Sequence, residues 1–199
     1  MTETRLRIDR SSPDGGSVRR ASGILLSGGV VLYPSDTVYG LMCRADDPAA
    51  VARVGRLKGY TGGRPYILLV SGTGMASGIA LLDGPGLTGL LGRLWPGPVT
   101  VVLPAALSCP DWVRSPDGTV ALRHPADPLS TMILAGTGVP LVSTSANAAG
   151  GRPALDPARI PGDLAVSVDL FLDGGVLPDR GPSRIIRPGR DGIEVIREA

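Results

Sequence analysis

The sequence predicts an α/β fold, a twisted open mixed sheet with helices on its faces. The chain has 199 residues, a length that suits one domain. Hydrophobic residues make up 43% of it and charged residues 19%, which is enough apolar content for a sizeable core. Short apolar runs also alternate with segments of helical pattern along the chain. Such alternation is typical of strands covered by helices.

The first elements follow from local signals. Residues 1–16 are polar and rich in glycine, and we expect a separate N-terminal segment there, followed by one domain over 17–199. A helix over 17–26 begins with a serine N-cap and ends before a pair of glycines. The wholly apolar run 30–33 then predicts a buried strand, which a proline ends.

The rest of the chain repeats this alternation. Asp46 or Asp47 caps a helix over 48–58, which has a proline at its first position. Further helices are expected at 75–82, 86–94, 128–135 and, as a short start, after Asp156-Pro157. Further strands are expected at 66–70, 99–103, 119–123, 139–142, 170–172, 184–187 and 193–197.

Composition argues against several classes of protein. The net charge of +2 is too small to indicate a nucleic-acid partner without a local basic patch. Cys43 and Cys109 match no zinc spacing, so we expect two buried free thiols and no metal site. No apolar run approaches the ~20 residues of a membrane helix, and no signal peptide is recognisable. We therefore expect a cytoplasmic protein without a membrane partner.

Common catalytic motifs are weak or missing. No P-loop is found, because Lys58 is followed by glycine instead of serine or threonine. The glycines of residues 72–78 follow a strand, but their spacing is wrong for a dinucleotide fingerprint, and a flexible turn explains them. No nucleophile elbow presents a serine to His124, which we interpret as a surface or loop histidine.

Polar side chains follow several expected strands, where open α/β sheets place their ligands. Ser35 lies in such a segment, residues 33–41. Lys58 begins a glycine-rich loop that contains Arg64, although a solvated lysine at a helix end is an equally good interpretation. Residues 143–147 leave room for close approach of a ligand, or form a capping turn.

Two arginines and two rare residues extend this set. Arg123 and Arg197 each end a strand and could bind a carboxylate or phosphate, or form surface ion pairs. Lys58 is the only lysine beside 19 arginines, and Asn147 is the only asparagine. The composition strongly favours arginine over lysine, so the single lysine and the single asparagine are candidates for a specific role.

Several of these segments occur together in one known family. They are 33–41 (YPSDTVYGL), Lys58, 95–100 (WPGPVT), 120–125 (VALRHP), 145–147 (SAN), and Ser183 ahead of Arg197. Each segment alone is weak, but their order is specific. From about Gly28 to Arg197 the chain resembles the YrdC-like threonylcarbamoyl-AMP synthases (L-threonylcarbamoyladenylate synthases), in their single-domain short form.

The resemblance implies a deep basic cavity that binds ATP, L-threonine and bicarbonate. The products would be pyrophosphate and threonylcarbamoyl-AMP, which downstream threonylcarbamoyl-transferase proteins use to modify tRNA. Mg²⁺ would arrive with ATP, and no residue is assigned to a metal. The implied catalytic residues are Lys58 and Arg123. The implied ATP-binding residues are Lys58, Arg64, Thr119, Ser145, Asn147 and Arg197. The implied threonine- and bicarbonate-binding residues are Ser35, Arg123, Ser143 and Ser183.

The chain also departs from the family pattern. Ser35 and Arg184 stand where threonine is usual, Tyr60 stands where an arginine is usual, and Glu198-Ala199 replaces a glycine. These departures leave an alternative, a non-catalytic paralogue that binds RNA or nucleotide through its basic cavity. For Lys58 we expect an ammonium group that lies in the cavity against the ATP phosphates and contributes little to folding stability.

Overall fold

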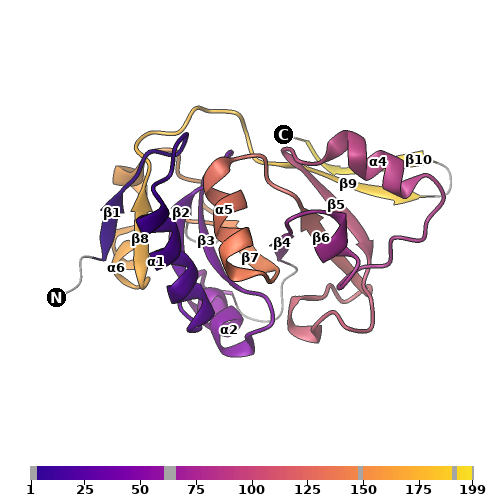
Figure 1. Cartoon of the computed structure of the whole chain (residues 1–199), viewed down its shortest axis with the longest axis horizontal. Coiled ribbons are helices and arrows are strands. Elements are labelled where there is room, and N and C mark those ends of the chain that lie inside the picture. The colour runs from indigo at the N-terminus through magenta and orange to yellow at the C-terminus, as the bar shows by residue number, and fades with distance from the viewer. Residues whose placement is uncertain (1–3, 61–65, 148–149, 190–191, 199) are drawn as a thin grey trace.

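The computed structural model describes residues 4–60, 66–147, 150–189 and 192–198. Within them, ten strands form one sheet in the order β1-β8-β2-β3-β7-β4-β6-β5-β9-β10. Figure 1 shows β1 at one end of the molecule and the β9–β10 hairpin at the other. The strands are β1 (Arg5–Arg7), β2 (Val31–Pro34), β3 (Tyr39–Arg44), β4 (Ile67–Leu69), β5 (Val99–Pro104), β6 (Thr119–Arg123), β7 (Leu141–Ser145), β8 (Leu170–Asp173), β9 (Arg184–Gly189) and β10 (Gly192–Arg197).

The sheet is mixed, as the sequence predicts. Strand β8 runs parallel to both β1 and β2, whereas β3 is antiparallel to both β2 and β7. The helices are α1 (Gly15–Leu26), α2 (Pro48–Leu57), α3 (Thr73–Ala76), α4 (Leu87–Leu94), α5 (Pro128–Thr137) and α6 (Gly162–Val166), with short 3-10 helices at Asp111–Val113 and Pro157–Arg159.

Helices cover both faces of the sheet. Side chains alternate along a strand, so Leu41 and Cys43 of β3 face one core and Met42 faces the other. Helices α2 and α4 pack against the first core, and α1 and α5 pack against the second. The central strands are thus packed between two apolar layers, and the polar ends of these strands build the site described below.

Among the described residues, three α-helices begin at an aspartate N-cap whose side chain accepts a backbone hydrogen bond. The Asp47 side chain accepts hydrogen bonds from the backbone of Ala49 and Ala50 at the start of α2, as expected. Helix α1 begins earlier than predicted, at Gly15, and its N-cap is Asp14. Ser17, which we expected to be the cap, instead donates its backbone N–H to that carboxylate.

The segment before α1 is more ordered than its composition suggests. Residues Arg5–Arg7 form β1, which pairs in parallel with β8. Arg5 also forms an ion pair with Asp173, and its guanidinium lies 4.5 Å from the centre of the Phe171 ring. These partners are about 165 residues away in the chain, so local composition gave no signal for this strand.

Other elements differ at their limits. Strand β3 was not predicted, because it begins inside the 33–41 motif, directly after the turn residues of that motif. The helix expected at 75–82 is a single turn, Thr73–Ala76. Strand β7 extends through Ser145, so the polar segment after the expected strand is partly the strand itself.

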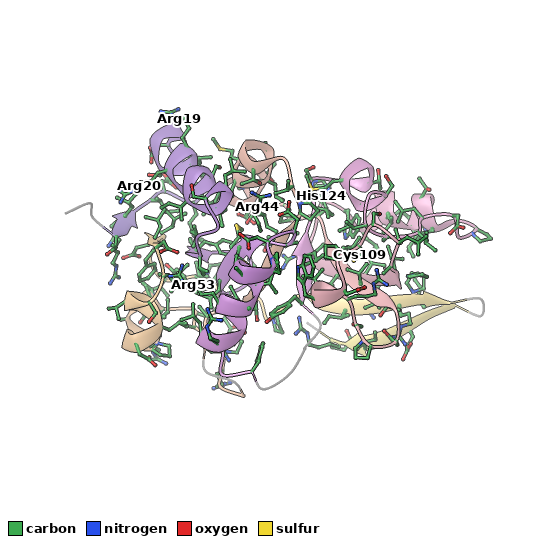
Figure 2. All side chains as sticks on the ribbon, turned by 90° about the horizontal axis from the view of Figure 1, so that it is seen from below. Arg19, Arg20, Arg44, Arg53, Cys109 and His124 are labelled. Atoms are coloured by element: carbon green, nitrogen blue, oxygen red, sulfur yellow. The ribbon has the colours of Figure 1, made fainter. Side chains whose placement is uncertain are left out.

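Cys43 and Cys109 are buried free thiols, as predicted; Cys109 is labelled in Figure 2. No helix in the described ranges is long and apolar enough to cross a membrane.

Candidate active site

A cavity of about 280 Å³ lies where the ends of the central strands meet the loop before β9. Its wall combines hydroxyl groups, two guanidinium groups and a few apolar side chains. The lining residues that the sequence analysis singled out are Ser35, Arg123, Ser143, Ser145, Ser183 and Arg197. Segments from positions 35 to 197 therefore converge on one site, and it is the one the motifs indicate.

Among the residues that the structure describes, the charged residues in this wall are Arg123 and Arg197. Arg123 is 5% exposed; its Nη2 forms an ion pair with Asp36, and its Nε donates to the carbonyl of Gly97 at 3.2 Å. Burial lowers the pKa of Arg197, and the nearby positive charge of Arg123 lowers it further. Two guanidinium groups close enough to repel each other favour an anionic ligand between or beside them.

The hydroxyl groups of the wall have different tasks. Ser35 Oγ donates to the carbonyl of Val38 at 2.6 Å and accepts from the backbone N–H groups of Thr37 and Val38. This hydroxyl therefore shapes its own turn, whatever else it contacts. Ser183 is anchored from two sides, because its Oγ lies 3.0 Å from Thr100 Oγ1 and 3.1 Å from Arg197 Nη2.

Lys58 lies behind the cavity wall instead of in the cavity. It is the C-cap of α2 and is only 2% exposed. Its Nζ donates to the carbonyls of Ser145 and Asn147, both at 2.6 Å, and to Asn147 Oδ1 at 2.8 Å. Burial lowers its pKa to about 8.

These contacts correct two expectations about Lys58. The ammonium group does not project into the cavity, and the side chain is not a solvated helix end. It fixes the turn over residues 145–147, and Ser145 in turn lines the cavity. The positive charge is therefore buried beside this turn, and the side chain is part of the folded framework.

Two further sequence-predicted residues, Thr119 and Asn147, are not among the lining residues. Thr119 lies at the opposite end of β6 from Arg123, where its Oγ1 donates to Asp117. The two residues still share a face of the strand, since they are separated by an even number of positions. Arg64 lies outside the described residues. Asn147 is buried beside Ser145 and Lys58 and is not among the lining residues.

The structure adds residues to which sequence reasoning assigned no role. Tyr60 and Tyr66 line the cavity, with ring centres 6.2 Å apart, and the Lys58 ammonium lies 5.9 Å from the Tyr60 ring centre. Asp36 is the partner of Arg123. Asp36 lies inside the 33–41 motif, but the local sequence did not indicate that its ion-pair partner is Arg123. His124, labelled in Figure 2, follows β6 directly and is half-buried, so it is a loop histidine without full exposure.

A second, wider groove adjoins the cavity. It measures about 590 Å³ and shares Val38, Pro153 and Pro182 with the cavity wall. Arg152 and Arg159 also line it. In the part of the chain that the structure describes, no three His, Cys, Asp or Glu side chains gather where they could hold a metal ion.

This arrangement defines a class of protein, an α/β protein with a small-molecule cavity suited to anions at the polar ends of its strands. Residues 23–199 match the sequence model of the Sua5/YciO/YrdC family, which carries the description "Telomere recombination". The chain belongs to this family.

Individual relatives agree with that assignment. The chain is 37% identical to the threonylcarbamoyl-AMP synthase of Nitrosococcus oceani, over 88% of this chain and 94% of that protein. It is 36% identical to the synthase of Halorhodospira halophila, over 90% and 94% of the two chains.

Solved structures share the fold. E. coli YciO superposes with a TM-score of 0.88 and 28% identity, over 100% of this chain and 96% of that one. P. abyssi Sua5, crystallised with L-threonine, gives a TM-score of 0.89 and 26% identity over 98% of this chain. The chain spans 57% of that Sua5 chain, which is therefore considerably longer.

Proposed function

We propose that this protein is a threonylcarbamoyl-AMP synthase, a nucleotidyltransferase that joins L-threonine, bicarbonate and ATP. The observation that carries the proposal is the convergence of Arg123, Arg197 and the serines of three separate segments on one cavity. Relatives of that name, at 36–37% identity over most of the chain, support the same reaction. They favour it over the non-catalytic paralogue that binds RNA or nucleotide.

The reaction needs no covalent intermediate on the protein. The threonine amine attacks the carbon of bicarbonate, and loss of water leaves a carbamate. A carbamate oxygen then attacks the α-phosphorus of ATP, the bond to the β-phosphate oxygen breaks, and pyrophosphate leaves. Both steps join anions, so positioning and neutralisation of charge are the contributions expected of the protein.

We assign the amino acid and its carbamate to Ser35, Arg123, Ser143 and Ser183. The cavity of about 280 Å³ suits a ligand of this size, since it is near the lower end of the usual range of about 300–1,000 Å³. We assign ATP to Lys58, Arg64, Thr119, Ser145, Asn147 and Arg197, with Lys58 acting through the turn that it holds. The adjoining groove offers room for the parts of ATP that the cavity cannot contain.

Mg²⁺ would enter with ATP. The phosphates supply the hard oxygen ligands that this ion prefers, so the protein needs no cage of its own. Further partners in this proposal are tRNA and a transferase that consumes the product. We place the reaction in the cytoplasm, which fits two reduced cysteines.

The test is direct. The protein is incubated with Mg-ATP, bicarbonate and one amino acid at a time, and pyrophosphate and the carbamoyl-adenylate are measured. We expect both products with threonine, and neither when bicarbonate is removed. Absence of pyrophosphate with every amino acid would overturn the proposal, and salt-sensitive RNA binding by such an inactive protein would favour the paralogue.

A further inference from the structure

A buried tyrosine contacts the cavity wall from behind. Tyr33, on β2, is 1% exposed. Its hydroxyl oxygen lies 2.7 Å from Ser143 Oγ on β7. In the sheet, β3 lies between these two strands, so the tyrosine side chain spans a whole strand to reach the serine.

Gly40 makes this reach possible. It stands opposite Tyr33 in the β2–β3 register. A Cβ atom at position 40 would lie 3.0 Å from Tyr33 Cε1 and 3.1 Å from the carbonyl oxygen of Thr144. A side chain at position 40 would therefore crowd the ring where it crosses β3, and glycine leaves that space open.

The surroundings favour Tyr33 as the donor of this hydrogen bond. Among the described residues, Ser143 Oγ is the one hydrogen-bond partner of the Tyr33 hydroxyl. Burial raises the pKa of Tyr33, so the phenol keeps its proton. A buried donor without an acceptor is unfavourable, and Ser143 Oγ is the acceptor within reach. The proton of Ser143 itself is then available to the cavity that this serine lines.

We propose that Tyr33 is a positioning residue, which donates to Ser143 and thereby turns the serine proton toward a carboxylate or carbamate oxygen of the bound amino acid. The inference rests on the proposed function, because it takes the ligand at Ser143 to be threonine. Tyr33 fixes Ser143 as a donor and itself touches no substrate.

The test measures threonine binding by calorimetry, which needs no turnover. Tyr33→Phe removes one oxygen and keeps the ring. We expect threonine affinity to fall about 3- to 10-fold, the size of one hydrogen bond, with ATP affinity unchanged. Tyr39→Phe is the matched control: this buried phenol bonds Gly174 and Gly175 on the far side of β3, so its loss should leave threonine affinity unchanged.

A double-mutant cycle separates positioning from general loosening. If Tyr33 acts through Ser143, adding Tyr33→Phe to Ser143→Ala should cause no further loss of threonine affinity. Losses that multiply, or an equal loss in Tyr39→Phe, would overturn the proposal, as would an unchanged affinity in Tyr33→Phe.

A crystal structure of the unaltered chain with L-threonine gives a readout that does not depend on how the variants fold. We expect Ser143 Oγ within hydrogen-bond distance of a threonine oxygen while it keeps its contact with Tyr33. A serine that instead accepts from the threonine ammonium would overturn the inference and leave the proposed reaction standing. Absence of threonine binding to the unaltered chain would overturn both.

Discussion

At the scale of single residues, the electrostatics of the site depend on the partly buried ion pair between Arg123 and Asp36. Asp36 is the carboxylate that meets Arg123, and the Gly97 carbonyl holds the same guanidinium from another side. Asp36 therefore does two things. It compensates part of the positive charge of the cavity, and it fixes the plane of the guanidinium relative to a bound anion.

Replacing Asp36 with asparagine should lower turnover more than it weakens binding. The side chain keeps its shape, but Arg123 loses its charged anchor and samples other orientations. We expect kcat to fall about 10-fold or more, because small misplacements of a positioning group are costly. Asp173→Asn is the control, since it breaks a different Arg–Asp pair at the edge of the sheet. Equal kcat values in the two variants would contradict the role given to Asp36.

Lys58 should matter for folding as well as for activity. In Lys58→Met, two carbonyls and the Asn147 side-chain oxygen lose their hydrogen bonds to the ammonium group. Asn147 Oδ1 still accepts from Ser145 Oγ, and the Ser145 carbonyl still accepts from the Asn147 N–H. We expect the free energy of unfolding to fall by about 1.5–3 kcal/mol, the range for a hydrogen bond to a charged group. Turnover should fall on the order of 10²- to 10³-fold if the charge also stabilises the transition state.

Arg56→Met provides the comparison for Lys58. It removes one positive charge from the same end of α2, but Arg56 is exposed. Chemical denaturation and initial rates of both variants distinguish the loss of the buried Lys58 contacts from the loss of one positive charge. A Lys58→Met protein as stable as Arg56→Met would show that the buried contacts contribute nothing to folding.

At the scale of elements, the packing of α1 on α5 depends on one glycine. A Cβ atom at Gly136 would lie 2.5 Å from Ser22 Oγ and 3.2 Å from Ser22 Cβ. The hydroxyl can rotate away, but the Ser22 Cβ cannot move without shifting α1. The sequence shows a glycine near the end of a helix and gives no hint of this contact.

Gly136→Ala should therefore destabilise the protein, by about 1–3 kcal/mol, as overpacking of a core does. Gly23→Ala is the matched control, because it lies in α1 with nothing within 4 Å of its added Cβ. That change should stabilise the helix by about 0.5–1 kcal/mol. Thermal unfolding of the two variants tests the pair, and shifts of the same sign would contradict the packing argument.

At the scale of the whole molecule, burial of ionisable groups makes stability depend on pH. Cys43, on β3, is fully buried, and burial raises the pKa of its thiol from 9.0 to about 12. The folded state thus keeps a proton that the unfolded chain releases above about pH 9. Stability from this group is fully present below pH 9 and is lost as the pH rises toward 12.

The difference between the parent and Cys43→Ala isolates this effect. The alanine variant should be less stable at neutral pH, because it leaves a cavity. The difference in the free energy of unfolding between the parent and this variant should then decrease above pH 9, by up to about 1.4 kcal/mol per pH unit. Urea unfolding from pH 7 to 10 measures both curves. Parallel curves would show that the thiol does not titrate differently in the folded and unfolded states.

The sequence by itself determined what depends on near neighbours in the chain. Aspartates followed by proline began helices at 48 and 128, and the apolar run at 119–123 became β6 without change. Motif order was also sufficient to predict the family, and it pointed to a part of the cavity wall that includes Ser35 and Arg197.

Tertiary structure decided what depends on distant partners. Polar composition at the N-terminus concealed β1, which forms only because β8 offers it an edge. Lys58 was expected to lie in the cavity or at a solvated helix end, but the turn at 145–147 surrounds its ammonium with three oxygens. Tyr33 acquired its partner across an intervening strand because position 40 carries no side chain. Local patterns reflect backbone preferences and amphipathicity, which act within a few residues, whereas burial and hydrogen-bond partners are fixed only when the whole sheet has packed.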